Sequence, residues 1–187
     1  RKLGVADNAP VLVAGSTFEG EEILLAELLP QWREVFPDLF LVLVPRHFER
    51  AGAVLDQLKS TKLKVARRTA METAPENPDV LLVDSTGELK SFFAVATVVF
   101  MGKSLTAQGG QNPIEPAAAA RAIVFGPFMQ NFRAVVGELL AAKGAVQVAD
   151  ETELSAKISV LLEDLEQREA LGAAALGVVL ANKGASQ

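Results

Sequence analysis

A glycine pair followed by a helix-start pattern lies in the middle of the chain, in the run Gly109-Gly110-Gln111-Asn112-Pro113-Ile114-Glu115-Pro116. The apolar segment 94–101 before it predicts a buried strand, and four alanines after it favour a helix. Asn112 suits an N-cap, Pro113 the first helical position, and Glu115 the third position of a capping box. Free N–H groups at a helix start beside a glycine loop can bind an anion such as phosphate. A purely structural cap is the alternative.

Polar residues also follow the ends of other expected strands. In a parallel α/β sheet, ligands lie beyond the carboxyl ends of the strands, so these residues should share one edge. The guanidinium of Arg46 offers a planar set of donors to phosphate, and Glu88 or Glu115 could accept hydrogen bonds from ribose hydroxyls. The candidates at this edge are Ser16, Thr17, Pro45, Arg46, Thr86, Gly87, Glu88, Gly110, Gln111, Asn112, Pro113, Ile114, Glu115 and Asn131.

Each candidate has a structural alternative. Arg46 could form a surface salt bridge, Glu88 and Glu115 could act only as helix caps, and His47 is expected to be a helix-entry residue rather than a catalyst. No G-x-G-x-x-G follows the first strand, and no G-x-x-x-x-G-K-[ST] is present. The triplet 102–104 reads Gly-Lys-Ser but lacks the first P-loop glycine, so we discount a P-loop.

The elements that must position these residues alternate between strand and helix about six times. This alternation predicts a doubly wound, Rossmann-like parallel sheet with right-handed crossovers, in a single domain over 1–187. Capping patterns are expected at Ser16 with Glu19 and at Ser85 with Glu88. The C-terminal helices start at about 151, with a break near 167–168 or at Gly172. The expected strands are 11–14, 39–44, a weaker edge candidate at 62–66, 80–83, 94–101, 122–125 and 145–148.

Composition restricts the classes of partner. The net charge is −5 and the pI near 5.0, which argues against a nucleic-acid or anionic-membrane surface because both need a basic face. With no cysteine and one histidine, thiolate and histidine-rich metal sites are excluded. No apolar run approaches the roughly 20 residues of a membrane span, so we expect a soluble chain. It begins at Arg1 without Met or a signal-peptide pattern, and we expect a piece of a longer protein.

Five blocks of the sequence occur together in order between about residues 11 and 140. They are Gly15-Ser16-Thr17 with Gly20-Glu21-Glu22, Pro45-Arg46-His47, Thr86-Gly87-Glu88-Leu89, Gly109 to Ala118, and Phe125-Gly126-Pro127 with Asn131-Phe132. In this arrangement the chain resembles the Kdo transferases. Those enzymes transfer 3-deoxy-D-manno-octulosonic acid (Kdo) from CMP-Kdo to the lipid A precursor (lipid IVA) in lipopolysaccharide biosynthesis of Gram-negative bacteria.

The resemblance implies the C-terminal, donor-binding half of a two-domain GT-B glycosyltransferase. It implies an inverting transferase at the cytoplasmic face of the inner membrane, with no metal and no nucleic-acid partner. The catalytic base, the acceptor site and the membrane contacts would belong to the N-terminal half, so we expect this chain to bind CMP without catalysis. The family often has histidine where Phe18 and Gln111 stand. The implied CMP contacts are Pro45, Arg46, Thr86, Gly87, Glu88, Asn112, Pro113, Ile114 and Glu115.

Two alternatives to this function stay open. One is a nucleotide-binding domain of another GT-B enzyme that uses a UDP-sugar. The other is a non-enzymatic α/β module that binds a small anion or a protein partner.

Overall fold

Seven parallel strands form the centre of the molecule in the computed structural model, which describes residues 3–185. Their spatial order is β3-β4-β2-β1-β5-β6-β7, and every neighbouring pair is parallel. This confirms the predicted doubly wound sheet. The strands are β1 (Val11–Thr17), β2 (Phe40–Pro45), β3 (Val65–Arg67), β4 (Val80–Leu82), β5 (Val98–Met101), β6 (Ala122–Phe125) and β7 (Val146–Gln147).

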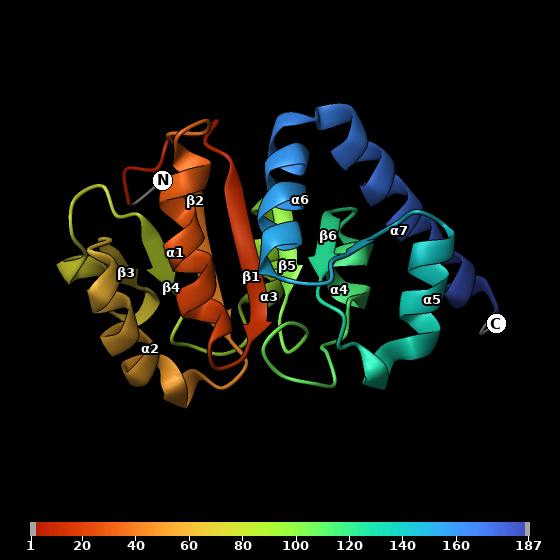
Figure 1. Ribbon diagram of the computed structural model, residues 1–187, viewed down its shortest axis with the longest axis horizontal. Helices are drawn as coiled ribbons and strands as arrows, with labels where there is room; N and C mark the ends of the chain where they lie inside the picture. The colour runs from red at the N-terminus through yellow and green to blue at the C-terminus, as the bar shows by residue number, and fades with distance from the viewer. Residues whose placement is uncertain (1–2, 186–187) are drawn as a thin grey trace.

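Helices cover both faces of this sheet (Figure 1). One core cluster joins α1, α2 and α6 to strand residues such as Leu12, and the other joins α3, α4, α5 and α7 to their neighbours, such as Val13. Successive strand residues point to opposite faces, so a strand covered on both faces is apolar without alternation. The helices are α1 (Glu21–Arg33), α2 (Ala51–Leu58), α3 (Leu89–Val95), α4 (Ile114–Ala118), α5 (Arg133–Ala141), α6 (Glu151–Glu163) and α7 (Leu165–Ala185).

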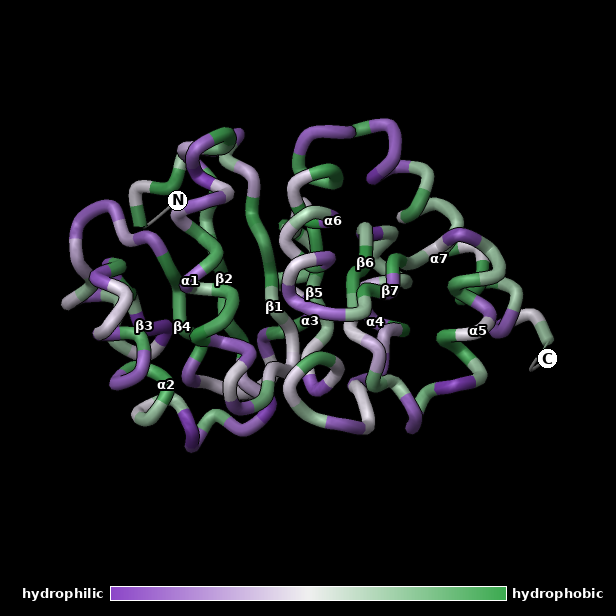
Figure 2. Tube along the Cα trace, viewed as in Figure 1, coloured by the Kyte–Doolittle hydropathy of each residue, from purple (hydrophilic) through white to green (hydrophobic). Residues whose placement is uncertain are grey.

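The hydropathy of the chain follows these layers. In Figure 2 hydrophobic residues concentrate along the central strands, while the outer loops are mainly hydrophilic. No helix formed by residues 3–185 combines the length and the hydrophobicity that crossing a bilayer requires.

The predicted strand 94–101 is too long at its start. Residues 94 and 95 belong to the end of α3, and β5 begins at Val98. Apolar residues at the end of a buried helix and at the start of a buried strand have the same local pattern, so periodicity cannot separate them.

The predicted capping boxes are wrong in detail. Gly20 rather than Ser16 occupies the N-cap of α1, and Ser16 lies within β1 with φ 54°. Ser85 donates a hydrogen bond to the Glu88 carboxylate instead of capping α3 through the backbone. Short polar side chains compete for nearby partners, and the strand geometry decides which partner is in reach.

The Asn112 pattern is partly correct. Pro113 holds the N-cap position of α4, and the Asn112 Oδ1 accepts the Ile114 N–H at 3.0 Å. The Glu115 carboxylate is exposed and has no hydrogen bond within residues 3–185, so it does not complete a capping box. The helix has five residues, fewer than the alanine run predicts.

The C-terminal helices break at Asp164, not at 167–168 or Gly172. Asp164 is extended (φ −98°, ψ 93°), and its Oδ1 accepts the Gln167 N–H at the start of α7. Gly172 lies inside α7, where a Cβ would come within 2.1 Å of the Ala120 carbonyl oxygen. This glycine therefore lets α7 approach the segment that follows α4.

Candidate functional site

The loops at the carboxyl edge of the sheet gather the candidate residues. Because all strands run parallel, the segments after β1, β2, β4, β5 and β6 leave from the same edge, at the bottom of Figure 1. The chain continues from β1 to one side of the sheet and returns to the other side at β5. Ligands of open α/β sheets bind outside the strand ends at such a reversal.

A hollow of about 210 Å³ lies at the ends of β1, β2 and β4. Val44, Phe48 and Leu89 give it apolar contacts. The structure thus brings together residues from three segments that the sequence predicts to share a site. Those lining the hollow are Ser16, Pro45, Arg46, Thr86, Gly87 and Glu88.

A larger hollow of about 480 Å³ lies between α1 and α6. It is lined by two carboxylates, Glu27 and Glu151, and by no lysine or arginine. An anion would be repelled there, so its size does not make it a nucleotide site.

Arg46 carries the free positive charge of the smaller hollow. Its backbone N–H donates to the Thr17 carbonyl at 3.0 Å, which fixes the residue at the end of β2. No carboxylate within residues 3–185 pairs with its exposed guanidinium, whereas Arg50, Arg67 and Arg68 all form ion pairs. The surface salt bridge considered as an alternative is therefore not formed within this range, and the guanidinium can bind an anion.

Glu88 also lines this hollow and is held by two neighbours. Arg68 donates to its Oε1, with the closest contact at 2.9 Å, and the Ser85 hydroxyl donates to Oε2. Gly87 before it has φ 83°, a conformation that glycine adopts without strain. A carboxylate has about four acceptor positions, so Glu88 can still accept hydrogen bonds from a hydroxyl-bearing ligand.

Asp84 supports the turn that carries Thr86, Gly87 and Glu88. It accepts hydrogen bonds from the Thr69 N–H (2.9 Å), the Thr69 hydroxyl (2.6 Å) and the Arg67 Nε (3.0 Å). Burial alone would raise the pKa of Asp84, but the bonds from Thr69 and Arg67 outweigh it and lower the pKa below the usual 3.8. These contacts join the ends of β3 and β4.

We expect Asp84→Asn to lower the free energy of unfolding by about 2 kcal/mol at pH 7, because it weakens hydrogen bonds made to a buried charge. A depressed carboxyl pKa stabilises the fold above the unfolded value of 3.8, and that contribution is lost as the pH falls through the folded pKa. The difference between the two proteins should therefore shrink from pH 7 to pH 3. Urea unfolding across this range measures it, and a difference independent of pH would contradict the assignment.

The second group of candidates follows β5 and does not line the hollow. Gly109 and Gly110 are buried and have φ values of 115° and 81°. The Gly109 N–H donates to the Gln130 Oε1, and the Asn131 N–H donates to the Gly109 carbonyl. This turn therefore packs against the loop after β6. Beyond it Asn112, Ile114 and Glu115 are exposed, Gln111 is half-buried and Pro113 is buried.

The two groups lie on loops whose strands are close neighbours, since β1 alone separates β2 from β5. Their joint contact with one nucleotide stays a prediction. For Thr17 the structure gives a different role, because its side chain is fully buried and its hydroxyl donates to the Glu22 Oε1 at 3.1 Å. Gly110 likewise serves the turn, because a Cβ would come within 2.5 Å of the Met129 sulfur.

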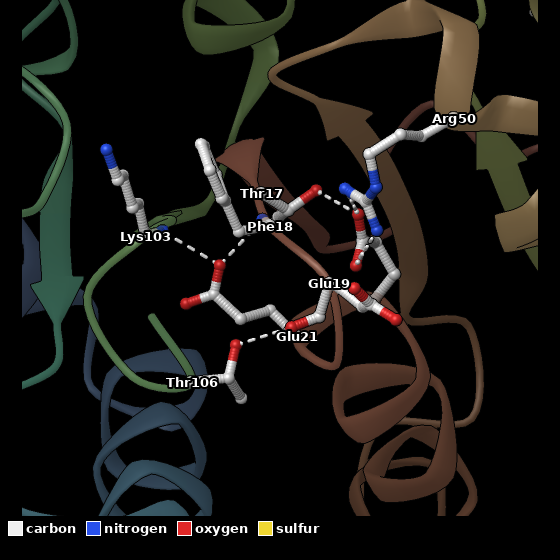
Figure 3. A network of polar contacts seen from close by, with 8 residues as sticks. Thr17, Phe18, Glu19, Glu21, Arg50, Lys103 and Thr106 are labelled. Atoms are coloured by element: carbon white, nitrogen blue, oxygen red, sulfur yellow. Dashed lines mark hydrogen bonds and ion pairs between the residues drawn. The ribbon is translucent and has the colours of Figure 1, made fainter. Parts of the chain in front are cut away.

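Two buried glutamates at the start of α1 organise this edge, and sequence analysis assigned them no contacts. The Glu21 Oε1 accepts the N–H groups of Phe18 and Lys103, each at 2.8 Å. Its Oε2 accepts the N–H groups of Ser104 and Leu105 at 3.2 and 3.1 Å. Figure 3 shows the bonds from Phe18 and Lys103. Burial raises the pKa of Glu21 above the usual 4.5, although these four hydrogen bonds oppose the rise.

Glu22 connects the loop after β1 to the segment after β2. It pairs with Arg50 at 2.9 Å and accepts the Thr17 hydroxyl. The signal in the sequence was the pair of glutamates directly after Gly20, but local spacing gives no indication of their partners. Together Glu21 and Glu22 join α1 to the loops after β1, β2 and β5, so they position the candidate site.

No protein-family model matches the chain. It is 36% identical over 179 residues to the 3-deoxy-D-manno-octulosonic acid transferase of Haemophilus influenzae, which covers 95% of this chain and 42% of that protein. The corresponding enzyme of Bordetella pertussis is 34% identical and covers 97% of this chain and 44% of that protein. Among solved structures, the C-terminal CMP-Kdo binding domain of WaaA from Acinetobacter baumannii superposes with a TM-score of 0.85 at 30% identity, covering 92% of this chain and 90% of that one.

The chain belongs to the Kdo transferase family. It spans less than half the length of the curated Kdo transferases it matches. Its parallel sheet with helices on both faces is the fold of the C-terminal half of GT-B glycosyltransferases. The predicted family and fold class are therefore confirmed.

Proposed function

We propose that this chain is the donor-binding domain of a Kdo transferase and binds CMP-Kdo at the carboxyl edge of its sheet. The observation that carries the proposal is the unpaired Arg46 guanidinium in a hollow shared with Gly87 and Glu88, no ion pair to it being formed within residues 3–185. It is supported by the likeness to a domain described as binding CMP-Kdo.

The residues have separate roles in this proposal. Arg46 donates to the phosphate of the nucleotide, while Thr86 and the backbone at Gly87 lie against the nucleoside. Glu88 and Glu115 accept hydrogen bonds from ribose hydroxyls. The Asn112 Oδ1 is used by the Ile114 N–H, so its amide nitrogen is the group left to donate to the ligand. The nucleotide also lies against Pro45, Pro113 and Ile114. Further candidate contacts are Ser16, Gln111 and Asn131.

The chemistry of transfer divides between two halves of the enzyme. A hydroxyl of the lipid A precursor attacks the anomeric carbon of Kdo, the bond from that carbon to the phosphate oxygen breaks, and CMP leaves. Arg46 stabilises the charge that develops on the leaving phosphate. The glutamate that removes the proton from the attacking hydroxyl belongs, in this proposal, to the N-terminal half. Residues of this chain bind the donor and supply no catalytic base.

The same division places the acceptor and the membrane contacts in the N-terminal half. We propose that the whole enzyme works at the cytoplasmic face of the bacterial inner membrane. We also propose that donor binding needs no metal ion, because Arg46 supplies the positive charge. Affinity for CMP that is equal in EDTA and in magnesium would support this, and loss of binding in EDTA would contradict it.

Titration calorimetry of the chain with CMP tests the proposal, with UDP as the competing nucleotide. We expect CMP to bind and Arg46→Ala to weaken it about 10- to 100-fold, because a charge-assisted hydrogen bond contributes about 1.5–3 kcal/mol. Lys157→Ala is the control, since it removes one positive charge from an exposed position of α6.

Three results would contradict the proposal. If CMP does not bind at millimolar concentration to a chain whose fold is verified by circular dichroism, the proposed donor binding is wrong. A preference for UDP would favour another GT-B enzyme. Unchanged binding in both Arg46→Ala and Glu115→Ala would favour a non-enzymatic anion-binding module.

A further inference from the structure

Lys103 has a backbone conformation that a lysine rarely adopts. Its φ is 55°, in the left-handed region, and Ser16 on the neighbouring strand end has φ 54°. Gly15 of β1 pairs with Met101 of β5, so Ser16 and Lys103 come shortly after this last pair, at the reversal of the sheet. Strained residues persist where the surrounding structure determines them, and they cluster at binding sites.

The backbone of Lys103 is held from both sides. Its N–H donates to the Glu21 Oε1 at 2.8 Å, and its carbonyl accepts the Gly110 N–H at 2.8 Å. The buried Glu21 carboxylate therefore keeps the backbone of this residue in place, so the starting point of its side chain is fixed before any ligand binds.

The side chain of Lys103 lies over an aromatic ring and forms no ion pair within residues 3–185. Its Nζ is 4.9 Å from the centroid of the Phe18 ring. Figure 3 shows that it extends beside Phe18 and away from the Glu21 carboxylate. A ring face orients an ammonium group but leaves its charge unneutralised, with donors still available.

Side-chain contacts lead from this ammonium to the residue next to Arg46. The Phe18 ring contacts His47 edge-to-face, with centroids 5.7 Å apart, and His47 directly follows Arg46. Lys103 is thus, among the described residues, a second cation without an ion pair on the same edge as Arg46. The inference that follows rests on the proposed function. If the donor binds at this edge, the position of Lys103 suits a second negative charge of the same donor molecule.

CMP-Kdo has such a charge, because an octulosonic acid carries a carboxylate on the anomeric carbon that is bonded to the phosphate. We infer that Lys103 binds the carboxylate of the donor sugar and so distinguishes a CMP-linked ulosonic acid from CMP alone. Phe18 holds the ammonium in position and forms an apolar wall beside it.

The test compares CMP with CMP-Kdo on the chain and on Lys103→Gln, which removes the charge and keeps most of the side-chain length. The wild-type chain should bind CMP-Kdo more tightly than CMP. Lys103→Gln should weaken CMP-Kdo binding about 10-fold and change CMP binding less than about twofold. Lys157→Gln, the same substitution on an exposed face of α6, should change neither.

Lys103→Gly is a second variant that does not depend on how glutamine is accommodated. Glycine adopts a φ of 55° without strain, so the melting temperature of the Lys103→Gly variant should equal or exceed that of the wild-type chain. The same variant should lose the preference for CMP-Kdo over CMP. Retained or raised stability together with loss of the preference for CMP-Kdo would support a binding role. Replacement of a purely structural lysine would not produce this combination.

The outcomes separate this inference from the proposed function. If CMP binds and both Lys103 variants keep the preference for CMP-Kdo, the inference fails and the proposed function stands. If Lys103→Gln weakens CMP and CMP-Kdo equally, Lys103 contacts the phosphate and the inference is again wrong. If the wild-type chain binds neither ligand, the proposed function fails and the inference falls with it.

Discussion

Replacing Gly102 by alanine is expected to lower the free energy of unfolding by about 3 kcal/mol or more, the upper range for overpacking. A Cβ at this position would lie 2.4 Å from the Ser16 carbonyl oxygen and 2.5 Å from the Thr17 Cα. Both are backbone atoms of β1, and the Gly102 N–H donates to the Gly15 carbonyl at 2.8 Å. Relief of the clash would therefore separate β1 from β5 at the edge that carries the site.

Urea unfolding followed by circular dichroism measures this effect, and thermal unfolding should show a fall of roughly 6–12 °C for a chain of this size. Gly52→Ala is the matched control. A methyl group added at Gly52 in α2 would meet no atom within 4 Å, so alanine should raise stability by about 0.5–1 kcal/mol. Equal stability of the two variants would show that the close approach of β1 and β5 is not needed.

Replacing Glu21 by glutamine is expected to destabilise the chain by about 3 kcal/mol, although the two side chains have the same shape. Each carboxylate oxygen accepts two backbone N–H groups, and the amide nitrogen of glutamine would face two of those donors. A buried donor without an acceptor costs about 1–3 kcal/mol. Glu27→Gln, at an exposed position of the same helix, is the control and should change stability little.

The pH dependence of Glu21 should be opposite to that of Asp84. A carboxyl whose folded pKa is raised stabilises the fold below its unfolded value of 4.5 and loses that contribution as the pH rises through the folded pKa. The wild-type chain should therefore gain stability over the Glu21→Gln variant as the pH is lowered from 7 toward 4.5. A stability difference that shrinks over this interval would contradict the assignment.

Most strands of the sheet could be predicted from the local sequence. The strand predicted at 122–125 coincides with β6, and the weak candidate at 62–66 overlaps β3 at the edge of the sheet. Apolar runs between turn residues predict buried parallel strands, because both faces of such strands are covered. Polar residues that follow those runs must then share one edge of the sheet. For this reason Arg46 and Glu88 could be assigned to the same site from the sequence, and both line the hollow.

Contacts between distant segments were decided by tertiary structure. Glu21 and Lys103 are 82 positions apart, and periodicity carries no information about which loop meets which helix start. The same limit applies to Gly172, whose role depends on the Ala120 carbonyl of another segment. By itself the sequence determined the parallel sheet, its family resemblance and the residues of one edge. The order of the strands, the hydrogen bonds of Glu21 and the strained position of Lys103 arise only when the sheet forms, since they depend on which strands become neighbours.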